Sequence, residues 1–256
     1  MLQIKCYRCY YALLKIKDIS EGITMKNGFK TGVLFLLAAA FLCACGKKAD
    51  IVDITVDNVD DYIENFSNYE GLDAGAEKEP LTDEIVEYYA DFYYERLCEE
   101  NPCLKDENGN NLPLTDKAIA SLNSEVYSNV SEYMVFIRGC VSDFLVSQYE
   151  NEVVENVIKE VISSSKFKEL PKDLIKNEEE TVIKAYEEVA ASYGLKVEKY
   201  LEYCGTSLEE EAKDSLLHKI VIVKIAKDKE IKDTEDKSQK EAVFDYILSV
   251  TGANDH

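Results

Sequence analysis

The feature that most constrains the fold is an unbroken helical pattern over residues 129–163. Apolar side chains recur there every three or four residues, polar side chains fill the opposite side, and no proline interrupts the pattern. This repeat is typical of an amphipathic helix, and 35 residues at 1.5 Å per residue extend about 50 Å. We therefore expect an elongated, mainly α, multi-helix body with long amphipathic arm helices.

Further helices are predicted on both sides of this segment. The tetrapeptide PLTD occurs at Pro80 and at Pro113, and each Thr can cap a helix whose first turn carries an Asp. In the first of these helices we expect a buried stripe at Ile85, Tyr88, Tyr89, Phe92 and Arg96. Later helices are expected over 171–192 and 197–204, from a cap at Ser207, and over about 234–250.

The segment before the first helix is expected to hold little regular structure. Ile51, Ile54 and Val56 permit one short strand, and residues 68–80 contain two glycines and a proline, which indicates a loop or an extended connector.

The N-terminal region resembles a bacterial lipoprotein signal. Lys26 and Lys30 precede an apolar run over 33–42, which is too short to span a bilayer but has the length of a signal core. The run ends in Leu-Cys-Ala-Cys, so Cys45 is expected to carry the lipid, with acyl chains such as palmitate. The chain would then be anchored on the extracytoplasmic face of the cell membrane.

These signals divide the chain into five expected regions. Translation from Met25 would give a short basic leader, so residues 1–24 are expected to lie upstream of the true start. Residues 25–44 form the signal peptide and 45–65 a lipid-anchored tether. Residues 66–112 form a linker with the first helix, and 113–256 form a helical domain.

The charge of the chain limits its partners. The formal net charge is −21, and loss of residues 1–44, with six basic and two acidic side chains, would change it to −25. Nucleic acid is excluded as a natural partner because binding it depends on cationic contacts with phosphate. The lipid, with Lys47 and Lys48, would hold this acidic body at a membrane, while its charge keeps it extended into solvent.

Few residues of the chain suggest reaction chemistry. There is no phosphate-binding glycine loop, nucleophile elbow or zinc-binding helix. The two histidines are His218, expected to be structural, and His256. We therefore expect no catalytic residues, metal or cofactor. Outside the cytoplasm Cys98 and Cys103 can form a disulfide around a short loop, or stay free.

The C-terminal half has a distinctive order of signals in Ser165–Lys232: a Leu-Pro helix start, a long amphipathic helix, YGL, then EKYLEYCGTSLEEE and an IAK helix end. In this order it resembles the C-terminal helical domain of trigger factor, a bacterial folding chaperone. It extends more weakly over residues 66–248. In that family an FK506-binding-type isomerase domain lies between the two positions marked here by PLTD, and only about 30 residues separate them in this chain.

The resemblance implies a chaperone body without the isomerase or ribosome-binding domains, and with no contact to the ribosome. Such a lipoprotein would hold unfolded or newly secreted polypeptides by apolar contacts without ATP. The candidate contact residues are Tyr186, Tyr193, Leu195, Tyr200 and Tyr203, each of which can equally pack between helices. Two alternatives remain: an envelope scaffold for one specific partner, and a related protein with residual prolyl isomerase activity.

Overall fold

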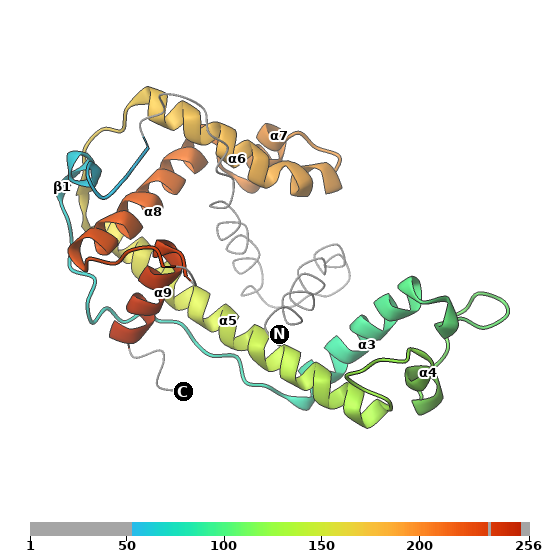
Figure 1. The fold of residues 1–256 in the computed structure, drawn as a ribbon. Coiled ribbons are helices and arrows are strands. Elements are labelled where there is room, and N and C mark those ends of the chain that lie inside the picture. Colours follow the sequence, from blue (N-terminus) through green and yellow to red (C-terminus); the bar gives the residue numbers. More distant parts are fainter. Residues whose placement is uncertain (1–52, 235–236, 252–256) are drawn as a thin grey trace. The chain divides into compact units, whose positions relative to one another are not determined.

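The computed structural model describes residues 53–234 and 237–251. Within these residues it contains seven α-helices, two 3-10 helices and one two-stranded sheet (Figure 1). The prediction of a mainly α fold with at most a short strand is confirmed. The described chain divides into two compact units, one formed by residues 77–149 and the other by residues 53–76 and 150–251.

The first unit begins at the two predicted Thr caps. Helix α3 spans Asp83–Glu100, and the Ile85 N–H donates to Thr82 Oγ1 at 3.3 Å. A short 3-10 helix η3 (Pro102–Leu104) leads to α4 (Asp116–Ser121), where the Ala118 N–H donates to Thr115 Oγ1, also at 3.3 Å. Both PLTD segments therefore start helices, as their sequence predicts.

The buried face of α3 differs from the predicted stripe. The row that is buried at intervals of four residues is Val86, Ala90, Tyr94 and Cys98. Tyr88 is exposed, and the other members of the predicted stripe, Ile85, Tyr89, Phe92 and Arg96, are only half-buried. The prediction was wrong because it ranked positions by aromatic size. The small side chain of Ala90 instead admits Tyr133, whose hydroxyl donates to the Ala90 carbonyl at 2.6 Å.

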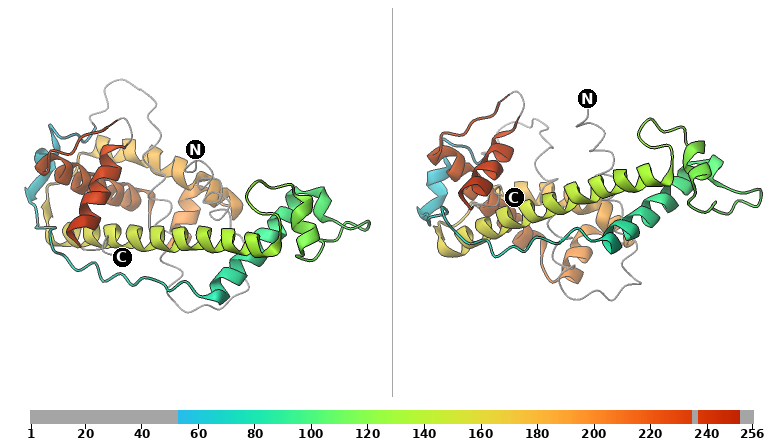
Figure 2. Two further views of the ribbon diagram at one scale, coloured as in Figure 1. Left: turned by 60° about the horizontal axis from the view of Figure 1, so that its bottom comes forward. Right: turned by 90° about the horizontal axis from the view of Figure 1, so that it is seen from below.

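Helix α5 is the long helix that the sequence predicts. It runs without interruption over Val130–Ser164, one residue beyond the expected range at its C-terminal end (Figure 2). Its buried side chains keep the helical spacing, with Tyr133, Ile137, Val141 and Leu145 in the first unit and Val153, Val157 and Val161 in the second.

The second unit contains four further helices, all of them predicted. They are α6 (Lys172–Ser192), α7 (Val197–Cys204), α8 (Leu208–Asp228) and α9 (Gln239–Val250). Helix α9 begins five residues later than expected, because Ser238 and Glu241 form a capping box there. In α8 the Glu210 N–H donates to Ser207 Oγ at 3.2 Å, and the β-branched run after residue 218 stays helical throughout.

The N-terminal part of this unit is more ordered than the sequence suggested. Residues 53–58 contain no strand, because Thr55–Asn58 form a turn in which the Thr55 N–H donates to Asn58 Oδ1 at 2.8 Å. A 3-10 helix η2 (Val59–Tyr62) follows, then β1 (Ile63–Asn65), which pairs antiparallel with β2 (Lys166–Phe167). The predicted strand at Ile54 and Val56 is therefore replaced by one that begins at residue 63.

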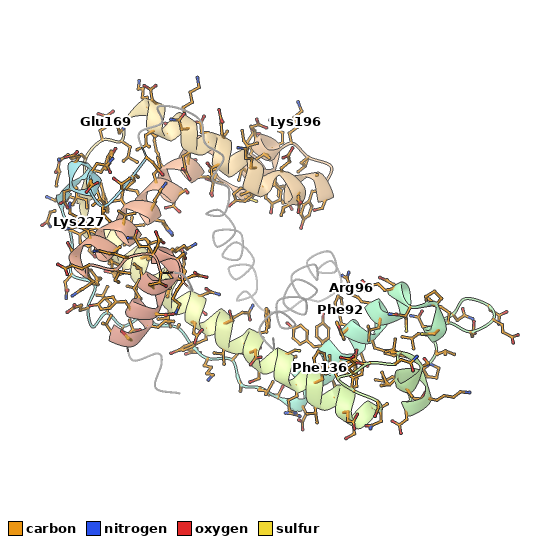
Figure 3. All side chains as sticks on the ribbon, in the orientation of Figure 1. Phe92, Arg96, Phe136, Glu169, Lys196 and Lys227 are labelled. Carbon is orange, nitrogen blue, oxygen red and sulfur yellow. The ribbon has the colours of Figure 1, made fainter. Side chains whose placement is uncertain are left out.

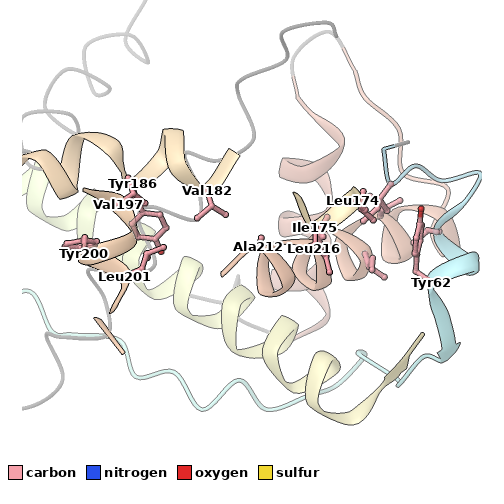
Figure 4. Close-up of a cluster of buried hydrophobic side chains, with 14 of the residues drawn as sticks. Tyr62, Leu174, Ile175, Val182, Tyr186, Val197, Tyr200, Leu201, Ala212 and Leu216 are labelled. Atoms are coloured by element: carbon pink, nitrogen blue, oxygen red, sulfur yellow. The ribbon is translucent and has the colours of Figure 1, made fainter. Parts of the chain in front are cut away.

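Residues 53–65, which we expected to be part of a tether, pack against the helices. Ile54, Val59 and Tyr62 are buried in one cluster with side chains of α6, α7 and α8 (Figure 4). We call residues 53–65 the N-terminal strap. Only residues 45–52 of the expected tether precede it.

Several predictions lie outside the described residues. These are the upstream extension 1–24, the signal peptide 25–44 and the lipid-bearing Cys45. Within 53–234 and 237–251, no helix has the length and apolar character needed to cross a bilayer.

Candidate functional site

The five predicted contact residues all lie on α6, on α7 or in the loop between them, but the structure separates them into two groups. Tyr186 and Tyr200 are buried in the core cluster of the second unit. Tyr193, Leu195 and Tyr203 are exposed, at 58%, 39% and 82% of their full accessible area. We call these three exposed residues the α6–α7 surface.

The position of this surface follows from how α6 ends. Gly194 adopts φ +66°, the left-handed conformation that glycine tolerates best. The Leu195 N–H then donates to the Ala190 carbonyl and the Gly194 N–H to the Ala191 carbonyl, both at 2.9 Å. This pair of bonds is the Schellman motif. It reverses the chain so that Tyr193 and Leu195, on either side of Gly194, face solvent.

A row of tyrosine rings connects the surface to the core. The ring centroids of Tyr193 and Tyr200 lie 5.6 Å apart, and those of Tyr200 and Tyr186 lie 6.1 Å apart. Burial, and then the nearby Cys204 thiol, raise the pKa of Tyr200 to about 12. Burial, followed by the Glu211 carboxylate that accepts its hydroxyl at 3.1 Å, raises the pKa of Tyr186 well above its ordinary value. Both inner rings are therefore neutral packing residues that support Tyr193.

Charges of both signs surround the exposed residues. Lys196 and Glu198 are exposed at the start of α7, and Lys199 Nζ lies 2.6 Å from Glu202 Oε2. Among the described residues, no ring contact joins Tyr203 to the tyrosine row. The surface therefore offers separate apolar contacts in a water-exposed, mixed-charge setting. Such contacts suit weak binding of flexible apolar chains.

The first unit has exposed apolar residues that sequence reasoning missed. Val135 is 70% exposed, and Tyr88 and Val126 are also exposed. The signal for Val135 was present, because it lies on the side of the long helix that otherwise carries polar residues. Phe92 and Phe136, labelled in Figure 3, are half-buried by comparison.

The titratable and sulfur-bearing residues show no reactive arrangement in the described part of the chain. His218 is largely buried on α8, with Nε2 3.6 Å from Glu155 Oε1 and 3.7 Å from Asp214 Oδ2, which agrees with the structural role expected of it. Cys98 is buried and Cys103 exposed, and both thiols are free in this structure, so their disulfide stays a prediction. Residues 53–234 and 237–251 contain no group of three metal-ligating side chains.

The comparison with known protein families gives one match. Residues 137–244 match the family described as bacterial trigger factor protein (TF) C-terminus. The matched segment runs from within α5 to within α9 and includes the whole α6–α7 surface, whereas Tyr88, Val126 and Val135 lie before it. The resemblance drawn from the sequence is therefore confirmed for this segment. No curated protein and no solved structure matches the chain.

Proposed function

We propose that this chain is a membrane-anchored, extracytoplasmic, chaperone-like lipoprotein that holds unfolded or newly secreted polypeptides without ATP. The observation that carries the proposal is the family match over residues 137–244. In trigger factor the C-terminal domain is the chaperone module and binds unfolded polypeptides. The exposed Tyr193, Leu195 and Tyr203 lie within the matched segment.

The physical basis of holding is weak apolar contact at several points. Burial of apolar surface contributes roughly 25 cal/mol per Å², so a few exposed aromatic and aliphatic side chains give adaptable, reversible binding. The net charge, −25 after loss of residues 1–44, keeps the chaperone soluble while it exposes them. Binding of this kind requires no nucleotide.

The holding activity is tested by aggregation of a refolding client protein in the absence of ATP. We expect the chain from residue 46 onward to suppress aggregation at a few-fold molar excess. The combined variant Tyr193→Ser, Leu195→Ser and Tyr203→Ser is expected to lose most of this effect. The matched control is Tyr88→Ser, Val126→Ser and Val135→Ser, three exposed apolar residues outside the matched segment. Equal loss of aggregation suppression in both variants would show that client binding does not depend specifically on the α6–α7 surface. No suppression by the unaltered chain would refute the holding activity.

The anchoring part of the proposal is supported by sequence alone. Leu42-Cys43-Ala44-Cys45 follows an apolar run of signal length, and Cys45 is where a lipoprotein carries its lipid. A Cys45→Ala variant should move from the membrane fraction to the soluble fraction, while Cys43→Ala should stay membrane-bound. Retention of the Cys45→Ala variant at the membrane would contradict the anchor.

A further inference from the structure

The N-terminal strap limits how far the helical body can lie from a lipid at Cys45. If residues 45–65 formed a free tether, its reach would be about 70 Å, because an extended chain spans at most about 3.3–3.6 Å per residue. The structure shortens that tether, because residues 53–65 are part of the folded second unit.

Apolar burial holds the strap in place. Ile54 is 3% exposed, Val59 is fully buried and Tyr62 is 8% exposed, all within the cluster that contains Leu174 and Leu216. Removal of these apolar side chains from water favours the packed strap over a free one. The Lys168 N–H also donates to the Tyr62 carbonyl at 2.9 Å, beside the β1–β2 pair.

Lysines of α8 add ion pairs along the same segment. Lys219 pairs with Asp53, and Lys227 Nζ lies 2.8 Å from Asp60 Oδ2. Lys224 Nζ lies 3.2 Å from Asp60 Oδ1. Exposed pairs of this kind add little to stability, so they fix the course of the strap more than its stability. The strap begins at Asp53, the first described residue, whose carbonyl also accepts from Asn58 Nδ2 at 2.8 Å.

We propose that the strap is the membrane-proximal part of the second unit and that its partner is the lipid surface. This inference rests on the proposed lipid at Cys45. Eight residue steps separate Cys45 from Asp53, which allows at most about 29 Å between the two. Asp53 therefore stays within that distance of the lipid, less than half of the reach of a free 45–65 tether.

With the strap at the lipid surface, the α6–α7 surface lies at the other end of α6. Tyr62 packs with Leu174 near the start of α6 (Figure 4). Tyr193 follows the end of the same helix. Nineteen residues of helix at 1.5 Å each separate Leu174 from Tyr193 by about 30 Å. A short tether at one end of α6 presents the holding surface at the other end, where a polypeptide that leaves the membrane can reach it.

The chain contains no tryptophan, so one inserted tryptophan is a clean fluorescence donor. The test uses the full lipidated chain in vesicles of phosphatidylcholine and phosphatidylglycerol that contain a dansyl-labelled lipid as acceptor. The donor positions are Asp57→Trp, exposed on the strap, and Tyr203→Trp, exposed on α7. We expect at least twofold higher transfer efficiency from position 57 than from position 203.

A third sample distinguishes a strap that stays packed on the helices, with a short tether, from a strap that has detached from them. Insertion of 12 Gly and Ser residues after Ala49 should lower transfer from position 57 toward the value at position 203, because the reach is then more than doubled. Equal transfer from the two positions, or no effect of the insertion, would overturn the inference while the anchor stands. A chain that does not float with the vesicles would overturn the anchor and, with it, this inference.

Discussion

At the scale of single residues, three helices end in the same Schellman motif, but only two of them have glycine at its left-handed position. Helices α6 and α7 end with Gly194 and Gly205 in the left-handed conformation, whereas α8 ends with Glu230 at φ +55°. The Ile231 N–H donates to the Ala226 carbonyl at 2.8 Å, as the Schellman motif requires. A side chain in this conformation costs about 1 kcal/mol relative to glycine.

Replacement of Glu230 by Gly should therefore stabilise the protein by about 0.5–1 kcal/mol, since part of the relief is offset by the freedom of glycine in the unfolded chain. Urea unfolding measures the change. Gly205→Ala is the matched control and should shift the midpoint in the opposite direction. A destabilising Glu230→Gly would show that the Glu230 side chain makes a favourable contact.

Tyr133 is a second residue whose contribution can be isolated. It is completely buried, and its hydroxyl donates to the Ala90 carbonyl between α5 and α3. Tyr133→Phe keeps the ring and removes only this bond, because the Ala90 carbonyl lies inside α3 and also accepts a helical N–H. The loss should therefore cost about 0.5–1.5 kcal/mol. The change is measured by denaturant unfolding, with Tyr88→Phe as the exposed control. Equal unfolding midpoints for the two variants would contradict a stabilising role of the Tyr133 hydroxyl.

Glu70 is expected to make the second unit sensitive to acid. The hydrogen bond from Lys229, and then the one from the Tyr246 hydroxyl at 2.7 Å, hold the pKa of the Glu70 carboxyl below its ordinary value of 4.5. Because this pKa is lowered in the folded state, the contribution is fully present above about pH 4.5 and is lost as the pH falls through the lowered value. Glu70→Gln should reduce the acid dependence of the unfolding midpoint below pH 5 and leave its slope near pH 7 unchanged. An unchanged acid limb in this variant would contradict the assignment.

At the scale of elements, the face of α3 provides a direct comparison between the predicted and the observed register. Val86 is 1% exposed, while Tyr88 belongs to the predicted stripe and is exposed. Val86→Ala should cost about 2 kcal/mol through loss of apolar burial and an added cavity. Tyr88→Ala should stay within about 0.5 kcal/mol. A larger loss of stability for Tyr88→Ala than for Val86→Ala, in thermal or urea unfolding, would indicate that the predicted aromatic stripe is the buried face of α3.

What the sequence predicts well is local. The Thr82 and Thr115 caps, the Ser207 cap and the long α5 pattern each depend on residues within a few positions of one another. The strap could not be found this way, because its partners on α8 lie more than 160 positions away along the chain. Strand β2, with two residues, carries no periodic signal at all.

The candidate site shows the same limit at the level of side chains. The sequence indicates that tyrosines are concentrated around α6 and α7, but helical spacing alone does not say which of them face the core. Tyr186 and Tyr200 are buried because α8 packs along α6, and Tyr193 is exposed because Gly194 ends α6 directly after it. Which of these tyrosines are exposed therefore depends on packing between elements.

At the scale of the whole molecule, the two units have separate cores and should respond separately to damage. The strap contributes Ile54, Val59 and Tyr62 to the core of the second unit, and the first unit buries its own cluster around Tyr133 and Ile119. Removal of residues 46–65 should destabilise the second unit by roughly 4 kcal/mol, because three apolar side chains are lost from its core. Removal of residues 46–52 is the matched control and should change little, because the strap remains.

Hydrogen exchange measured by segment distinguishes the two units. After removal of residues 46–65, amides of α6 and α8 should exchange faster by a factor of a hundred or more, since each 1.4 kcal/mol changes the opening equilibrium about tenfold. Amides of α3 should be unaffected, because no residue of the strap belongs to the core of the first unit. Faster exchange in both units would show that they unfold together. Identical exchange in the two deletions would show that the strap adds nothing to the fold, so that the long tether expected from the sequence would describe the chain after all.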